Sequence, residues 1–373
     1  MKIGIVVPFS WSYWGGVVEH SENQAKALRA RGHEVKIVMG HDPPGTLTRL
    51  LHPRSGRHGD LPADIIPVGR SVVVPANGSL PNIVLSPRSI PRVRQVLRDE
   101  RFDLVHLHEP MTPAICTAAL SFARCPIVAT WHASGNLAWL RLATPWWGFL
   151  IDRVDARVAV SRMAAESAQR WLGGEFEVIP NGVVIPEHAD AENREDTVVF
   201  IGRHDARKGL PVLLRAWPEI RRRTGARLRL IGCDPLQYRL LHSRLRFDED
   251  GIDVLGIVTN EVRSEELAAA KVFVSPALGG ESFGLVLVEA FATATPVVAS
   301  DIPGFSAVST PEAAKLVPPG DEGALVEAVV ALLEDEPRRV AMGRAARRLA
   351  EERYSWTDVA RRLEEIYERV AAA

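Results

Sequence analysis

Short, nearly continuous apolar runs recur along both halves of the chain. The first run, residues 2–9 (KIGIVVPF), precedes a glycine-containing loop, a helical pattern and a second run at 35–40. Because strands buried on both faces are apolar along their whole length, these runs predict parallel strands. The same order starts again at residues 197–202 (TVVFIG). We therefore expect an α/β protein built from two doubly wound domains.

The length of the chain supports the same division. At 373 residues the chain exceeds the size at which a single hydrophobic core normally suffices. Asn181-Gly182 and the polar run 191–196 (AENRED) mark a linker. We place the first domain at residues 1–185 and the second at 186–355.

Composition and charge exclude several function classes. A formal net charge of -1 argues against nucleic-acid partners. Cys116, Cys125 and Cys233 have no metal-ligand spacing, so we expect neither a metal site nor disulfides, and a reducing compartment. The strand-like start leaves no room for a signal peptide, and no apolar run approaches the ~20 residues that span a bilayer. We expect a cytoplasmic protein whose membrane contact, if it has any, is peripheral.

Residues 275–300 (SPALGGESFGLVLVEAFATATPVVAS) concentrate the chemistry of the chain. Glu281 follows two glycines, and the segment LVLVEAFA, which contains Glu289, has the pattern of a buried helix. Counted from Glu281, Glu289 falls about two turns inside that helix. Free N–H groups at the start of a helix, together with its dipole, make an anion site. The residues that would form this site are Ser282, Phe283, Gly284 and Leu285.

The alternative is a buried helix whose glutamate is satisfied by structure alone. Burying a carboxylate among apolar residues is costly without a partner, which favours a functional role for Glu289. A ligand with hydroxyl groups at both ends and a diphosphate between them fits the order of these residues. A nucleotide-sugar has those parts.

Three further loops lie where ligands bind in doubly wound sheets, beyond the carboxyl ends of strands. One contains Arg203 and Lys208, a pair that can neutralise a diphosphate without a metal, or form a solvated basic loop. Another contains His132, which follows the apolar run 125–131. A turn at Gly256-Ile257-Val258 places Val258 where a nucleotide base would bind.

A pair of glycines, Gly15-Gly16, opens the first helix and lets a ligand approach the backbone closely. The loop lacks the G-x-G-x-x-G spacing of dinucleotide enzymes, which argues against a nicotinamide cofactor. His20, on the helix that follows, is expected to be a packed residue rather than a ligand.

The segment 88–101 (RSIPRVRQVLRDER) predicts a basic amphipathic helix. Ile90, Val93, Val96 and Leu97 share one side of this helix. Such a helix can lie on an anionic membrane surface or pack on the sheet with a solvated basic face, and the sequence favours neither. The cations that would contact lipid are Arg88, Arg92, Arg94 and Arg98.

Glutamates separated by seven residues, as at 281 and 289, resemble the signature of retaining family-four glycosyltransferases. Within that family the chain is most similar to phosphatidylinositol mannosyltransferases, and the resemblance covers essentially its whole length. The segments that carry it are PFSWSYWGG, VPANGS, FDLVHLHEP, PIVATWHAS, IPNGV, GGESFGLVLVEA and SDIPGF. The resemblance implies the GT-B fold: two Rossmann-like domains facing across a cleft, with a final helix (356–373) that crosses back to the first domain.

The resemblance also implies roles for the predicted site residues. His132 would hydrogen-bond the donor sugar, Glu281 would hold sugar hydroxyls and Glu289 the ribose. The Gly15-Gly16 loop would lie near the donor diphosphate, and Asn77 near the acceptor. The family uses no cofactor; the implied donor is GDP-mannose and the implied acceptor is phosphatidylinositol on the inner face of the cell membrane.

The chain departs from its relatives at several positions. It has Leu137 and Asn82 where they have a lysine and an arginine, and Asn260 where an acidic residue near guanine is expected. The arginine–lysine loop is one residue shorter. These departures leave GDP-sugars and UDP-sugars both open as donors. They also leave open a soluble polyol acceptor, such as a sugar or an inositol phosphate, in place of the lipid.

Two interpretations lie outside the transferase class. One is a catalytically inactive nucleotide-binding scaffold, against which the intact set of predicted site residues argues. The other is a sugar-nucleotide epimerase of related architecture, which would act on a donor without any acceptor.

Overall fold

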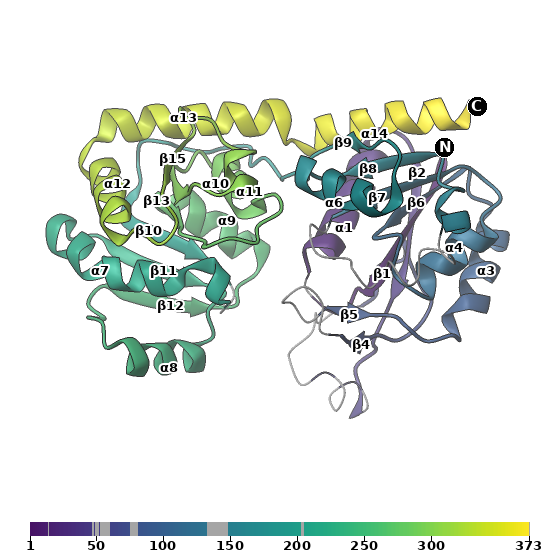
Figure 1. The fold of residues 1–373 in the computed structure, drawn as a ribbon, viewed down its shortest axis with the longest axis horizontal. Coiled ribbons are helices and arrows are strands. Elements are labelled where there is room, and N and C mark those ends of the chain that lie inside the picture. The colour runs from purple at the N-terminus through teal and green to yellow at the C-terminus, as the bar shows by residue number, and fades with distance from the viewer. Residues whose placement is uncertain are drawn as a thin grey trace. The chain divides into compact units, whose positions relative to one another are not determined.

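The computed structural model describes residues 1–13, 15–46, 48, 52, 60–74, 81–132, 148–202 and 205–372. Internal contacts divide the chain into two compact units. The N-terminal unit comprises residues 1–182 together with 356–373, and the C-terminal unit comprises residues 183–355. Each unit is an α/β sandwich around a mainly parallel sheet, so the predicted fold class is confirmed (Figure 1).

The N-terminal sheet has the strand order β3-β2-β1-β6-β7-β8-β9, and neighbouring strands in this order are parallel. A short antiparallel pair, β4 and β5, joins it at the end of β1, where Phe9 pairs with Ile83. The strands are β1 (Lys2–Ser10), β2 (Glu34–Gly40), β3 (Ile65–Pro67), β4 (Val72–Val73), β5 (Asn82–Ile83), β6 (Leu104–His108), β7 (Ile127–Trp131), β8 (Ala156–Ala159) and β9 (Glu177–Val178).

Helices cover both faces of this sheet. On one face, α1 (Gly16–Ala30) and the last helix, α14 (Trp356–Ala371), pack against each other and on β1. On the other face lie α3 (Ser89–Glu100) and α4 (Ile115–Phe122), and α6 (Arg162–Leu172) follows β8. Apolar residues of β1 alternate between the two cores, which explains why the strand is apolar along its length.

The C-terminal sheet has the strand order β12-β11-β10-β13-β14-β15, again with parallel neighbours. Its strands are β10 (Glu195–Ile201), β11 (Arg227–Ile231), β12 (Ile252–Gly256), β13 (Ala270–Ser275), β14 (Val297–Ser300) and β15 (Ala314–Val317). Its helices are η1 (Ala206–Lys208), α7 (Leu210–Thr224), α8 (Pro235–Leu245), α9 (Asn260–Ala269), α10 (Leu285–Ala292), α11 (Pro303–Ser306), α12 (Glu322–Glu334) and α13 (Glu336–Arg353).

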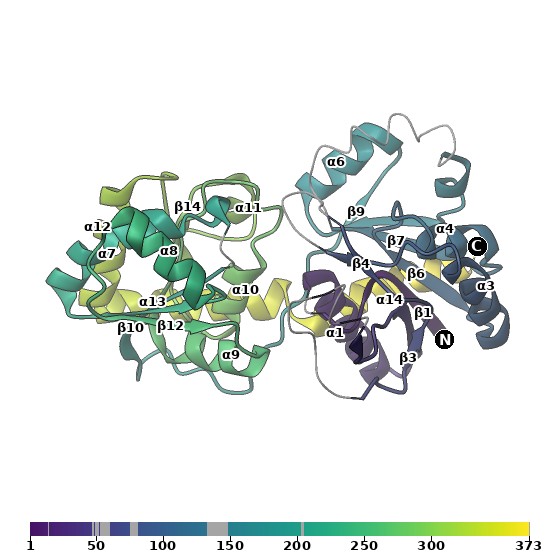
Figure 2. The same cartoon turned by 90° about the horizontal axis from the view of Figure 1, so that it is seen from below.

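The helices of this unit also divide between two faces. Residues of α7, α8 and α12 pack on one face of the sheet, and residues of α9, α10 and α13 pack on the other. Figure 2 shows α8 and α9 on opposite sides of β12.

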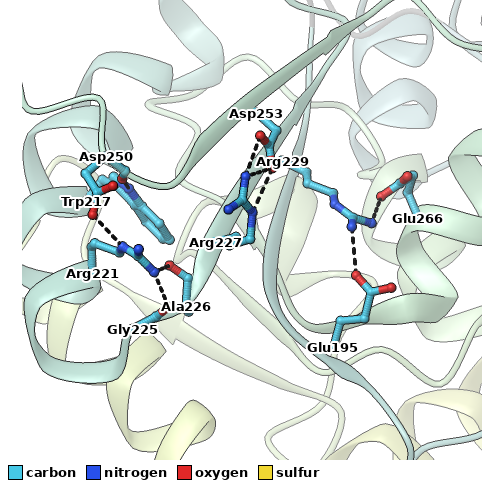
Figure 3. A network of polar contacts seen from close by, with 10 residues as sticks. All are labelled: Glu195, Trp217, Arg221, Gly225, Ala226, Arg227, Arg229, Asp250, Asp253 and Glu266. Carbon is cyan, nitrogen blue, oxygen red and sulfur yellow. Dashed lines mark hydrogen bonds and ion pairs between the residues drawn. The ribbon is translucent and has the colours of Figure 1, made fainter.

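One face of β11 and β12 is partly solvated, and it carries the ion pairs of Arg227 and Arg229 that Figure 3 shows. Arg229 donates to Glu195 at 2.7 Å and to Glu266 at 2.5 Å, and Arg227 pairs with Asp253 at 2.8 Å. Between the two arginines, Leu228 points into the opposite core. The alternating sequence RLRL follows from this difference between the two faces.

The strand order places one topological switch point in each unit. In the N-terminal unit the chain leaves β1 in one direction and returns to its other side at β6, and in the C-terminal unit it does the same at β10 and β13. Ligands of doubly wound sheets bind beyond the carboxyl ends of the strands at such points. The loops that contain the predicted site residues follow these strands.

None of the helices in the described ranges has the length and apolar character needed to cross a membrane. The apolar residues of α3 are used within the fold: Val93 and Val96 are buried, and Ile90 and Leu97 pack against the same core. The arginines Arg88, Arg92, Arg94 and Arg98 all remain exposed.

Candidate functional site

A cation and a carboxylate meet at the switch point of the C-terminal unit. Lys208, at the end of η1 after β10, places its Nζ 2.7 Å from Oε1 of Glu281 in the loop after β13. Both side chains are largely buried, with 22% and 17% of their surfaces exposed. The structure therefore brings together two residues that the sequence placed in separate loops.

The loop that contains Lys208 is held in place by its neighbours. Asp205 caps η1 by accepting from the Arg207 N–H at 2.9 Å, and its carboxylate also pairs with the Arg207 guanidinium at 2.6 Å. The hydrogen bond from Arg207 lowers the pKa of Asp205. The Leu278 N–H donates to the Arg207 carbonyl at 2.7 Å, which ties this loop to the loop that contains Glu281.

Two glycines permit the close packing of these loops. Gly209 has φ +71°, and a Cβ built on it would lie 1.7 Å from the Pro276 carbonyl oxygen, a full overlap. Gly284 has φ +87°, and its Cβ would lie 2.8 Å from the Phe305 ring. Because both positions combine a left-handed backbone with a close neighbour, only glycine fits them.

The predicted helix over LVLVEAFA is confirmed as α10, which begins at Leu285 after the Gly284 cap. The first N–H groups of a helix have no intrahelical acceptor, so those at the start of α10, together with the loop residues 282–284 before it, are candidates for an anion site. Glu289 lies one turn inside α10, not two, because residues 281–284 form a loop rather than helix. Its Oε1 accepts from Nη2 of Arg263 on α9 at 2.9 Å.

Histidines gather at the switch point of the N-terminal unit. His132 follows β7, its Nε2 lies 2.8 Å from Nδ1 of His108 at the end of β6, and its backbone N–H donates to Glu109 at 3.0 Å. The ring of His20, on α1, stacks edge-on against the His132 ring with centroids 4.8 Å apart. Burial lowers the pKa of His20 to about 4 and that of His132 well below its ordinary value, so both are neutral at pH 7.

Gly15 and Gly16 form the start of α1, with Gly15 as its N-cap. Neither has a left-handed backbone, and no described atom lies within 4 Å of a Cβ built on either one. Local sterics therefore do not require glycine at these two positions, unlike at Gly209.

The structure describes only some of the remaining predicted site residues. Val258 is partly buried and packs against the same core as Leu285. Arg203 and Asn77 lie outside the described residues. Asn260 begins α9 and Asn82 lies in β5.

Sequence reasoning did not single out several residues that contact the predicted ones. Arg207 lies near Glu281, which helps to raise the pKa of Arg207 after the larger effect of its hydrogen bond to Asp205. Arg263 pairs with Glu289, and His108 with His132. Each partner comes from a different element, and only the histidines offered a signal, since FDLVHLHEP is a buried strand with two histidines.

Comparison with known proteins matches both units. A family model described as Glycosyltransferase Family 4 matches residues 14–185, and one described as Glycosyl transferases group 1 matches residues 195–335. The phosphatidyl-myo-inositol mannosyltransferase of Mycobacterium leprae is 36% identical over 100% of this chain and 98% of that protein. That of Mycolicibacterium smegmatis is 35% identical over 100% and 95%.

Solved structures agree on the fold. Sucrose-phosphate synthase from Thermosynechococcus elongatus aligns with a TM-score of 0.74 over 100% of both chains, at 19% identity. Anabaena HepE, solved with UDP-glucose, aligns with a TM-score of 0.72 over 99% of this chain and 100% of that one, at 20% identity.

The contact between Gly209 and Pro276 predicts a difference between two matched substitutions. Gly225 has the same φ of +71° but no atom within 4 Å of a built Cβ. Gly225→Ala should lower the free energy of unfolding by about 1–2 kcal/mol through backbone strain alone. Gly209→Ala should cost roughly 2 kcal/mol more, because the methyl group overlaps a carbonyl oxygen. Differential scanning calorimetry of both variants measures the difference, and equal melting temperatures would contradict the contact.

Proposed function

The chain belongs to the family-four glycosyltransferases, and on that premise we propose that it transfers mannose from GDP-mannose to phosphatidylinositol with retention of configuration. The enzyme class follows from the family, and a nucleotide-sugar is the donor that such enzymes require. The acceptor class is supported by the full-length similarity to proteins named phosphatidyl-myo-inositol mannosyltransferases.

One observation carries the donor part of the proposal: the Lys208–Glu281 pair beside the start of α10. In the proposed complex the donor diphosphate takes Lys208 as its counter-ion and accepts from the N–H groups of Ser282, Phe283, Gly284 and Leu285. Glu281 then accepts hydrogen bonds from hydroxyls of the hexose. Arg203 keeps its predicted role as a second cation for the diphosphate, and Val258 its predicted place near the base.

Glu289 is proposed to hold the ribose. Its side chain is 14% exposed and already receives one hydrogen bond from Arg263, which fixes its orientation. Arg263 therefore acts as a positioning residue for this carboxylate. A carboxylate has two oxygens and about four acceptor sites, so Glu289 can accept from Arg263 and from a ribose hydroxyl together.

The chemical step requires stabilisation of the leaving group more than acid–base chemistry. The bond between the anomeric carbon and the diphosphate oxygen breaks, and the acceptor hydroxyl forms a new bond on the same face of the sugar. The acceptor proton passes to an oxygen of the departing diphosphate. Negative charge grows on that diphosphate, so a fixed cation and aligned N–H groups lower the barrier.

His132 is proposed to hydrogen-bond the transferred hexose. Its neutral state suits this role, because a neutral imidazole adds no positive charge beside the developing oxocarbenium ion. The hydrogen bond from its backbone N–H to Glu109 and the contact with His108 hold the end of β7 in place.

Membrane contact is proposed to occur through the exposed arginines of α3, with Asn77 near the acceptor. Because Val93 and Val96 are buried in the core, this helix would bind lipid by charge rather than by insertion. Such binding depends on anionic headgroups, of which phosphatidylinositol is one.

A panel of donors and acceptors tests the function. Released nucleotide is measured for GDP- and UDP-hexoses, with vesicles that contain phosphatidylinositol, vesicles without it, and soluble inositol phosphate. We expect GDP-mannose with phosphatidylinositol vesicles to give the fastest release, together with a mannosylated lipid. If nucleotide release is equally fast with soluble inositol phosphate, the acceptor is soluble. Faster release from a UDP-hexose would reassign the donor. No release from any donor would favour an inactive scaffold.

Two lysine variants separate the donor site from general ion pairing. Lys271 pairs with Asp196 at the opposite end of the same sheet. Lys208→Ala should lower kcat/KM about 100- to 1,000-fold, because the cation that stabilises the leaving diphosphate is lost. Lys271→Ala should leave kcat/KM within about twofold, since the pair that it removes lies at the opposite end of the sheet from the proposed donor site. Steady-state kinetics on both variants measures the difference. Near-normal turnover by Lys208→Ala would overturn the assignment of Lys208 as the cation for the diphosphate.

The glycines at the start of α1 give a further test. In the family such a loop lies near the donor diphosphate, which would explain why Gly16 is a glycine without local steric need. Gly16→Ala should leave the melting temperature unchanged or slightly raised, because alanine is favoured in helices by about 0.5–1 kcal/mol. It should lower kcat/KM by roughly 100-fold if the methyl group displaces the donor by about an ångström.

A matched control is Gly148→Ala, which also adds a methyl group in a helical segment with no described atom within 4 Å. This variant should keep both its melting temperature and its kcat/KM. If Gly16→Ala is as active as Gly148→Ala, the diphosphate does not approach Gly16.

A further inference from the structure

Three histidines from separate elements of the N-terminal unit converge. His20 comes from α1, His108 from the end of β6 and His132 from the residue after β7. One ring nitrogen from each lies within 4.8 Å of the corresponding nitrogens of the other two. No other group of three histidine, cysteine or acidic ligand atoms this close was found in the part of the chain that the structure describes.

One ring nitrogen of the cluster, Nδ1 of His20, is buried and has no hydrogen-bond partner. The side chains of His20 and His108 are themselves enclosed, with 8% and 0% of their surfaces exposed. A buried polar atom left without a partner costs about 1–3 kcal/mol, so this nitrogen, on a ring that contacts those of His108 and His132, favours a polar ligand beside them.

A neutral imidazole has one ring nitrogen with a free lone pair, so each of the three rings can offer one nitrogen to a metal ion.

We propose that His20, His108 and His132 bind one divalent transition-metal ion of the zinc class. Three imidazoles with a fourth position open is a coordination set that Zn²⁺ adopts. Imidazole nitrogens favour zinc-class ions, whereas Mg²⁺ and Ca²⁺ require oxygen ligands. The three nitrogen ligands therefore favour a zinc-class ion over Mg²⁺ or Ca²⁺.

Small movements are enough to complete the site. Nitrogens bound to one tetrahedral Zn²⁺ lie about 3.4 Å apart, given Zn–N distances of about 2.0–2.1 Å. The His108 and His132 nitrogens, now 2.8 Å apart in a hydrogen bond, must separate by roughly half an ångström. The other pairs must approach. Glu109 accepts from the His132 backbone N–H, which fixes the main chain of one proposed ligand.

Such an ion would act against transfer. Once its ring nitrogen is bound to metal, His132 can no longer offer that nitrogen to a hexose hydroxyl, so zinc would inhibit the enzyme. This consequence rests on the proposed function, whereas metal binding itself does not.

Binding is tested on the tag-free, full-length protein with Co²⁺ as a spectroscopic probe and Zn²⁺ as a competitor. We expect one equivalent of Co²⁺ per chain, with the intense visible d–d bands of tetrahedral coordination, which Zn²⁺ abolishes. Zn²⁺ should also raise the melting temperature, because it binds the folded state. Wild-type protein without these bands or without a stoichiometric endpoint would overturn the proposal, and this reading needs no variant.

Variants then assign the ligands. His20→Gln and His108→Gln should each weaken Co²⁺ binding by roughly 100-fold or more, while far-ultraviolet circular dichroism confirms that they fold. His188→Gln, at an exposed histidine of the C-terminal unit, should bind as the wild type does. If both His20→Gln and His108→Gln still bind Co²⁺ as the wild type does, the metal lies elsewhere and the proposed site is wrong. None of these readings depends on transferase activity.

Discussion

One hydrogen bond, from the Leu278 N–H to the Arg207 carbonyl, joins the two loops on which the proposed donor site depends. It can form because Gly209 lets the Pro276 carbonyl approach the start of α7 without a steric clash. This contact holds the loop after β10 against the loop after β13, so that Lys208 reaches Glu281. Backbone packing at the switch point therefore sets the positions of the two charged side chains.

The sequence predicted well those features that depend on local pattern. Continuous apolar runs identified the buried strands, and the helix over LVLVEAFA was placed with both of its ends correct. The depth of Glu289 was wrong by a turn, because the left-handed Gly284 keeps residues 281–284 out of the helix. A count of residues between two glutamates cannot show where a helix begins.

Contacts between elements could not be read from the chain. The pairs Arg263–Glu289 and His108–His132 each join residues 24 or 26 positions apart, and no periodicity links them. The segment at 88–101 left two interpretations open because a wheel shows which residues share a side, not what covers that side. In the structure the core covers Val93 and Val96, so the apolar side of the helix is not free for a partner.

The Lys208–Glu281 pair has a consequence for which molecules can settle at α10. Without a ligand the two charges satisfy each other in a largely enclosed place. In the proposed site an anion without hydroxyl donors would pair with the ammonium group and leave the carboxylate unpaired, and a polyol alone would leave the ammonium unpaired. A molecule with both an anion and hydroxyl donors exchanges one neutral arrangement for another. The proposed pair therefore favours a ligand in which a sugar is joined to a diphosphate over either part alone.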